Sequence, residues 1–109
     1  HYHIMLCELL SNDLIDYEDF RKMEAVRWLR NKLVHNIYFQ PSMETYKIFI
    51  KKACDRDLTN SEQREIESGA KKIEDKLRDK VIEIYAKIYN KYNKKIENIV
   101  KELIEKGEL

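Results

Sequence analysis

The sequence predicts an all-helical protein, a bundle of about four helices with a long C-terminal helix. Three observations support this. Only 2 Gly and 1 Pro occur in 109 residues, Lys, Glu and Ile together fill 41 positions, and apolar residues recur at three- and four-residue spacing. Tight hairpins depend on Gly and Pro, whereas Lys and Glu favour helices and the spacing marks helix faces. At this length we expect one domain, either a whole protein or part of a longer one.

The first two helices are expected before residue 40. A short apolar helix over residues 4–10 is followed by a polar break at residues 11–13. A second helix then starts between Asp16 and Asp19 and continues to about Tyr38. The apolar residues that recur along this second helix share one face, which predicts the side that packs in the core: Val26, Leu29, Leu33 and Ile37.

The third helix follows the break at residues 40–42. Ser42 has a side chain suited to an N-cap, and Glu44 places a negative charge in the first turn, where the helix dipole favours it. We expect this helix to continue to about residue 56. The residues expected on its apolar side are Tyr46, Phe49, Ile50 and Ala53.

The fourth and longest helix is expected from about residue 60 to about residue 106. Thr59 and Glu62 have the spacing of a capping box, and no proline follows them. Gly69 weakens the start, and a bend is expected near residues 90–93, because Asn competes for backbone hydrogen bonds. The apolar residues of this helix are Ile66, Ala70, Ile73, Leu77, Val81, Ile84, Ile88, Tyr92, Ile96, Ile99 and Leu103. They advance 37 residues in ten steps, a period of 3.7, which indicates a nearly straight bundle helix rather than a heptad coiled coil.

Charge is distributed unevenly along the chain, although the formal net charge is only +1. Residues 1–20 sum to −5, residues 21–56 to +6, and residues 57–109 to 0. The near-neutral total excludes a basic coat over the whole surface. The basic middle block is compatible with a local patch for phosphate groups, and the alternative is a solvated, Lys-rich helix face.

The expected setting of the protein is the cytoplasm, with no membrane partner. No run approaches the roughly 18 apolar residues that span a bilayer. Cys7 and Cys54 have neither the density of a disulfide scaffold nor the spacing of a zinc site. The N-terminus shows no signal-peptide pattern, and the chain begins without Met, which suggests processing or trimming.

The polar side of the second helix carries a candidate site. At 100° per residue, Arg27, Asn31, His35 and Tyr38 lie opposite the apolar face, and Asn31 and His35 are one turn apart. Arg30 lies about 140° round the helix from His35. These two side chains therefore flank one cleft only if the arginine curls across, the helix is distorted, or a second subunit brings its own copy alongside.

The stretch Arg30-Asn31-Lys32-Leu33-Val34-His35 reads R-N-x-x-x-H, which resembles the R-x4–6-H signature of the HEPN domains. Those are small helical bundles, many of which are metal-independent endoribonucleases that dimerise and build the active site where two motifs meet. The resemblance, carried by residues 26–39, implies RNA as substrate, a homodimer, no metal or other cofactor, and products with a 2′,3′-cyclic phosphate. It also implies a role as a toxin or in antiviral defence, with an antitoxin protein as a further partner.

The residue types in the motif suit this chemistry. Cleavage without a metal must remove the 2′-OH proton and stabilise negative charge on the phosphorane. We assign His35 as base or acid, Arg30 as the group that holds the scissile phosphate, and Asn31 as the group that orients the phosphate or His35. The candidates for further RNA contacts are Arg27, Lys32, Tyr38, Lys47, Lys51 and Lys52.

Two other interpretations stay open at this point. A histidine on the polar side of an amphipathic helix is commonly only solvated. Trp28 and Tyr38 beside the motif could stack on bases, but aromatic residues at helical spacing more often serve core or dimer packing. The alternative function is a noncatalytic helical module for dimerisation or protein interaction, in which the long helix over residues 60–106 packs against a partner.

Overall fold

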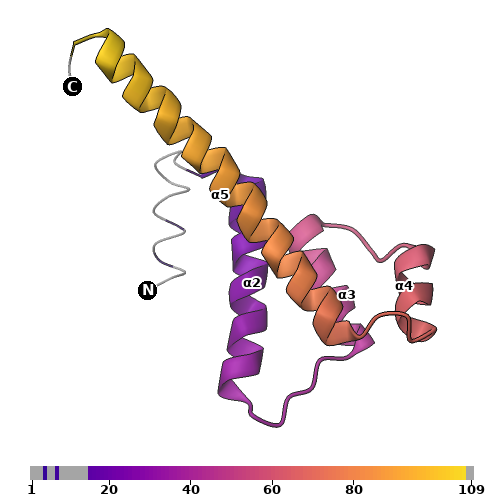
Figure 1. The fold of residues 1–109 in the computed structure, drawn as a ribbon. Coiled ribbons are helices and arrows are strands. Elements are labelled where there is room, and N and C mark those ends of the chain that lie inside the picture. The colour runs from indigo at the N-terminus through magenta and orange to yellow at the C-terminus, as the bar shows by residue number, and fades with distance from the viewer. Residues whose placement is uncertain (1–3, 5–6, 8–14, 108–109) are drawn as a thin grey trace.

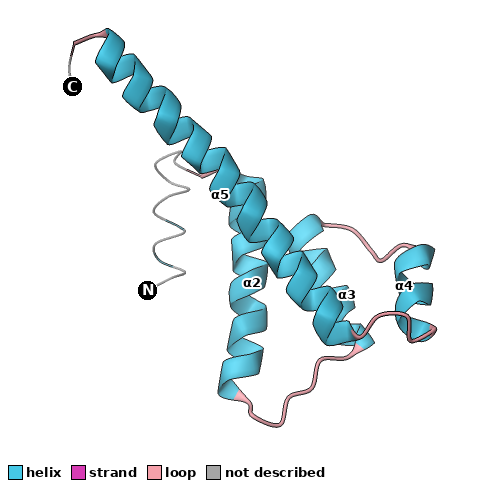
Figure 2. Cartoon of the chain, viewed as in Figure 1, coloured by secondary structure: helices cyan, strands magenta, loops and turns pink. Residues whose placement is uncertain are grey.

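The structure, a computed structural model, describes Ile4, Cys7 and residues 15–107. Residues 15–107 form four α-helices, and no strand occurs among the described residues (Figures 1 and 2). The helices are α2 (Tyr17–His35), α3 (Met43–Cys54), α4 (Asn60–Glu67) and α5 (Ile73–Glu105). The predicted all-helical fold with a long C-terminal helix is confirmed. The short helix expected over residues 4–10 lies outside the described residues, apart from Ile4 and Cys7.

Helix α2 begins where expected and ends early. The Asp16 carboxylate accepts a hydrogen bond from the Asp19 backbone N–H at 2.9 Å and caps the first turn. At the other end, the Asn36 side-chain oxygen accepts a hydrogen bond from the Tyr38 backbone N–H at 3.1 Å. This local bond competes with the helix, which stops at His35 rather than Tyr38. The prediction that Ile37 faces the core is therefore wrong, because its side chain is 84% exposed.

Leu33 was expected on the same buried face and is also exposed. Leu29 and Val26, one and two turns earlier, are buried as predicted. The buried stripe of α2 thus stops after Leu29. The apolar face of this helix is covered over its middle turns and open to solvent in its last turn.

The next two helices start with the caps that the sequence predicts. The Ser42 side chain accepts from the Thr45 N–H at 3.3 Å, and the Thr45 hydroxyl accepts from the Ser42 N–H at 3.0 Å. Thr59 and Glu62 form a second reciprocal capping box at the start of α4. Helix α3 ends at Cys54, two residues before the expected end, because Asp55 adopts a left-handed conformation with φ +53°.

Residues 60–106 do not form one helix, which corrects the prediction. Helix α4 ends at Glu67, and α5 begins only at Ile73. Gly69 lies in the turn between them with φ +77°, a conformation that interrupts an α-helix and that glycine adopts without steric cost. The bend expected near residues 90–93 does not occur, since α5 continues through them as one straight helix (Figure 1).

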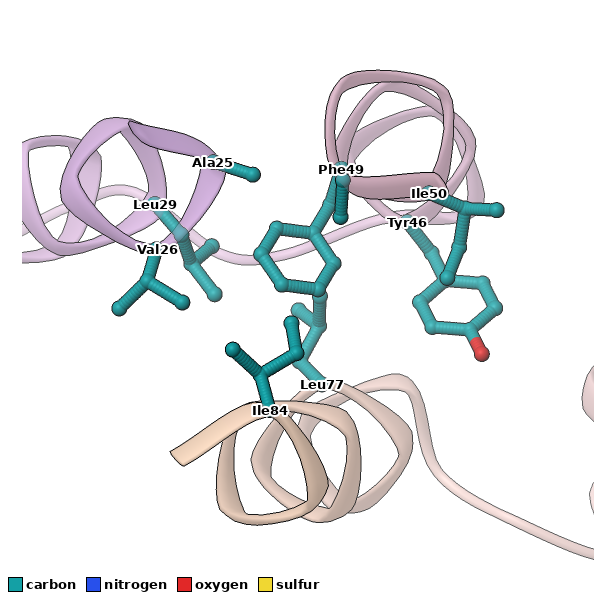
Figure 3. Close-up of a cluster of buried hydrophobic side chains, with 9 residues drawn as sticks. Ala25, Val26, Leu29, Tyr46, Phe49, Ile50, Leu77 and Ile84 are labelled. Carbon is teal, nitrogen blue, oxygen red and sulfur yellow. The ribbon is translucent and has the colours of Figure 1, made fainter. Parts of the chain in front are cut away.

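The core lies where α2, α3 and α5 meet. Helix α3 packs beside α2, and α5 crosses both (Figure 1). Figure 3 shows Phe49 extending from α3 toward α2 and α5, and this side chain is 0% exposed. The buried residues of this hydrophobic cluster are Ala25, Val26, Leu29, Tyr46, Phe49, Ile50, Ala53, Leu77 and Ile84. All four residues predicted on the apolar side of the third helix are among them.

A polar cluster joins the start of α2 to α5. Asp19, which is buried, accepts hydrogen bonds from the Lys91 ammonium at 2.8 Å and from the Tyr92 hydroxyl at 3.0 Å. Lys91 also pairs with Asp16, and the Asp16 backbone N–H donates to the Tyr92 hydroxyl at 3.2 Å. The Lys91 ammonium lowers the pKa of Asp16, and the Asp16 and Asp19 carboxylates raise the pKa of Lys91. These contacts fix α5 against the N-terminal end of α2.

Candidate nucleic-acid interface

The C-terminal half of α2 borders an open hollow of about 400 Å³. It is lined by Arg27, Trp28, Asn31, Lys32, His35 and Asn36. Five of these residues lie on one side of the helix, in alternating steps of one and three residues, and Asn36 follows directly after the helix end. The predicted juxtaposition of Asn31 and His35 is therefore present in the structure. The hollow places an imidazole, two amides and two cationic side chains beside an indole ring.

Two lysines from different helices flank the Trp28 ring. The Lys32 ammonium lies 5.9 Å from the ring centroid, and the Lys52 ammonium from α3 lies 5.6 Å from it. Lys52 reaches this position because α3 packs beside α2. Both distances are within the range of cation–π attraction. Among the described residues neither lysine forms an ion pair, so the Trp28 ring has two positive charges beside it that no carboxylate neutralises.

Arg27 differs from these lysines because an acid already engages it. Its guanidinium contacts the Glu24 carboxylate at 2.9 and 3.0 Å, one turn earlier on α2. An RNA phosphate would have to compete with Glu24 for Arg27. The uncompensated positive charge in this region therefore comes from Lys32, which lines the hollow, and from Lys52, which lies over the Trp28 ring.

Arg30 does not line the hollow that contains His35. Both side chains are exposed, and within the described part of the chain neither makes a hydrogen bond or an ion pair. The regular helix through residue 35 keeps them on different sides, as the 140° separation predicts. One chain thus presents the two groups separately, and a site that contains both needs a second copy or a rearranged arginine.

The other three residues considered for RNA contact lie elsewhere. Tyr38 is exposed in the turn after α2 and does not line the hollow. Lys47 borders a different hollow, next to Leu58 and Gln63. Lys51 lies 3.9 Å from the Asp55 carboxylate, at the C-terminal end of α3. Of the six candidates, Arg27, Lys32 and Lys52 are thus the ones brought to the region of Trp28.

Sequence reasoning missed how Trp28 and Asn36 contribute to this surface. The spacing of Trp28 and Lys32, four residues apart on one helix, was a readable signal for their contact. The approach of Lys52 had no comparable signal, because it depends on how α3 packs against α2. Asn36 ends the helix through its side chain, which places it at the edge of the hollow.

Comparison of the chain with protein-family models, curated proteins and solved structures found no match. Over the described residues, no three or more His, Cys, Asp or Glu side chains gather as a metal ion would require. No helix in that part of the chain is both long and apolar enough to cross a bilayer.

Proposed function

We propose that the protein is a HEPN-type endoribonuclease that needs no metal ion. One observation carries this proposal: His35 and Asn31 share an open hollow with Lys32, beside Trp28. An imidazole can move a proton near neutral pH, a lysine can hold a phosphate, and an indole can stack on a base. Groups that can move a proton, hold a phosphate and stack on a base thus lie along one side of α2.

The reaction would be an internal transesterification. The His35 imidazole takes the proton from a ribose 2′-OH, and the 2′-oxygen forms a bond to the adjacent phosphorus. The bond between phosphorus and the 5′-oxygen breaks, and a protonated imidazole or a water molecule gives that oxygen a proton. The product strand ends in a 2′,3′-cyclic phosphate. Arg30 stabilises the extra charge on the phosphorane, and Asn31 orients the phosphate or His35.

The position of Arg30 supports a site made by two copies of the chain. Its side chain lies outside the hollow of its own His35, so in a homodimer the Arg30 of one copy would serve the His35 of the other. A role as a toxin or in antiviral defence, controlled by an antitoxin protein, is part of this proposal and rests on the R-N-x-x-x-H motif.

The decisive experiment measures cleavage of labelled single-stranded RNA by the purified chain in EDTA, with the product ends identified by mass spectrometry. His35→Ala is expected to lower the rate by about 10²- to 10⁴-fold, and Arg30→Ala by about 10²- to 10³-fold. Arg64→Ala, at an exposed arginine of α4, is the matched control and should leave the rate unchanged. No cleavage by the wild type, or full activity in both site variants, would refute the nuclease.

Mixing the two inactive variants tests the shared site. A heterodimer of His35→Ala and Arg30→Ala chains contains one intact site if Arg30 acts across the interface. The mixture should then regain about a quarter of the wild-type rate, since about half of the dimers are mixed and each has one working site. An inactive mixture would show that Arg30 serves the His35 of its own chain.

RNA affinity provides a separate test of the lysines around Trp28. Lys32→Ala and Lys52→Ala should each weaken binding and reduce the slope of log affinity against log salt by about 1. Lys101→Ala, exposed on α5, is the control and should leave both quantities unchanged. Equal effects of all three substitutions would indicate nonspecific attraction to the whole surface.

A noncatalytic interaction module is the second candidate function. The observation that favours it is the row of apolar side chains that α5 exposes beyond its contacts with α2 and α3, including Ile96 and Ile99. Such a surface is typical of a contact with another protein. If the wild type does not cleave RNA, this is the function that the structure supports.

A further inference from the structure

Helix α5 carries two apolar faces. The first packs on the bundle core and consists of Ile73, Leu77, Val81, Ile84 and Ile88. The second lies about a quarter turn further round the helix. Its members are Ile82, Tyr85, Tyr89, Tyr92, Ile96, Ile99 and Leu103. Steps of three and four residues alternate along this second row, which is the spacing of the seam in a left-handed coiled coil.

The second row continues where the first has ended. From Asn93 to the end of α5 no residue is buried, and this part of the helix extends past α2 and α3 (Figure 1). Ile96 is 59% exposed and Ile99 is 56% exposed. Contiguous apolar surface of this kind marks an interface. The occupant must present an apolar row of matching spacing.

We propose that the occupant is a second copy of this chain, paired antiparallel through the same row, with the two-fold axis between Glu97 and Asn98. Ile96 then packs against Ile99 of the partner subunit, and Leu103 packs against the ring of Tyr92 of the partner subunit, whose hydroxyl remains bonded to Asp19 of its own chain. Symmetry repeats each of these contacts, so the seam has four layers of paired apolar side chains.

The charges beside the row favour this register over its neighbours. Lys95 and Glu102 occupy equivalent positions seven residues apart on one edge of the row, and in an antiparallel pair these edges face each other. With the axis between residues 97 and 98, Lys95 lies opposite Glu102 of the partner subunit, and the pair occurs twice. Charge complementarity of this kind sets partner and orientation in coiled coils.

Other arrangements lose these ion pairs. If the partner helix is shifted by one heptad so that the two-fold axis lies nearer the N-terminus, Lys95 lies opposite Lys95 of the partner subunit. A shift of the partner helix in the other direction brings the two Glu102 residues together. A parallel pair places Lys95 beside Val100 of the partner subunit, where it finds no acid. Like charges at facing positions are destabilising, so one register satisfies both the apolar and the charged positions.

This contact is independent of the proposed RNA cleavage. His35 ends α2, whereas Asp16 and Asp19, at the start of α2, contact Lys91 and Tyr92 of α5. The hollow and the projecting part of α5 therefore lie toward opposite ends of α2. Pairing through α5 leaves both hollows open and does not itself bring the two His35 residues together.

Sedimentation analysis of the full chain tests the contact directly. The wild type should be associated at about 100 µM, and Ile99→Asp should raise the dissociation constant at least about 100-fold, because it places a charge in the apolar seam. Ile104→Asp is the matched control, since Ile104 is 60% exposed and lies outside the row. Circular dichroism should show unchanged helix content in both variants, because neither side chain is buried.

A charge exchange tests the orientation. Lys95→Glu and Glu102→Lys should each weaken association at least about tenfold, because each chain then pairs with its own like charges. An equimolar mixture of the two variants should recover wild-type association, because the antiparallel heterodimer contains two opposite-charge pairs. The His35→Ala variant should associate as the wild type does, so this test and the cleavage assay fail separately.

Three results would overturn the proposal. One is a monomeric wild type at about 100 µM, well above the Kd of a specific dimer. Another is that Ile99→Asp and Ile104→Asp raise the dissociation constant by the same factor. The third is a mixture of Lys95→Glu and Glu102→Lys chains that associates no better than either variant alone, which would indicate a different orientation or a different occupant.

Discussion

The two ends of α2 are both polar, and their side chains are used in opposite ways. At the N-terminal end Asp16 and Asp19 are engaged by Lys91 and Tyr92 of α5. At the C-terminal end the His35 side chain is exposed and, within the described residues, has no hydrogen bond or ion pair. Paired polar groups hold helices together, whereas solvated ones are available to a ligand. The contrast separates structural from candidate functional residues on one helix.

The largest expected effect on stability comes from removing the acceptor at the N-terminal end. Asp19→Ala leaves the Lys91 ammonium and the Tyr92 hydroxyl without the carboxylate that both contact. We expect the free energy of unfolding to fall by about 2 kcal/mol in urea denaturation. Glu18→Ala, at the exposed neighbouring acid, is the control, and equal losses in both variants would contradict the structural role of the cluster.

A smaller effect is expected from the hydroxyl alone. Tyr92→Phe keeps the ring and removes one donor to Asp19 and one acceptor for the Asp16 backbone N–H. The unfolding free energy should fall by about 1 kcal/mol. In the Asp19→Ala background most of this loss should vanish, because the two groups act on the same contact. Full additivity in the double mutant would argue against a shared cluster.

The ion pair at this end also predicts a dependence on pH. Lys91 lowers the pKa of Asp16 in the folded state from its usual value of 3.8. The ion pair therefore contributes stability above pH 3.8, and this contribution is lost as the pH falls through the lowered pKa. Because Asp16 is exposed, we expect only about 0.5 to 1 kcal/mol. The difference in unfolding free energy between the wild type and Lys91→Met should shrink as the pH falls below about 4. A constant difference would contradict the pair.

Local features of the fold could be predicted from the sequence. The caps at Ser42 and Thr59 depend on side chains within three residues of the helix start, and both form as expected. The same holds for Asn31 and His35, whose one-turn spacing brings them to one hollow. Local geometry also predicted that Arg30 would lie apart from His35.

The predicted apolar ladder of the long helix was wrong where one average period was applied to residues that lie on two different helix faces. The expected ladder joined Ile66 and Ala70 to the residues of α5, although Gly69 breaks the helix between them. With its period of 3.7, the predicted ladder also joined residues from two faces of α5. Leu77 and Ile84 belong to the inner, buried face, whereas Ile96 belongs to the exposed row. The alternating steps of three and four in the outer row were readable in the sequence.

Contacts between distant segments had no local signal. The approach of Lys52 to Trp28 and that of Lys91 to Asp19 depend on how three helices pack. Asn36 shows a different reason for error. Its side chain bonds to the Tyr38 backbone and ends α2, although the residues around it fit a longer helix. Propensity and periodicity favour continuation there, and one hydrogen bond decides against it.

The smallest expected effects on stability belong to the C-terminal end of α2. His35→Ala and Arg30→Ala remove exposed side chains without partners among the described residues, so the unfolding free energy should change by less than about 0.5 kcal/mol. If the same variants abolish RNA cleavage, the loss cannot come from unfolding, and the separation between the two ends of α2 becomes one of function. A loss of stability comparable to that of Asp19→Ala would instead show that these side chains hold the fold together, and the contrast would collapse.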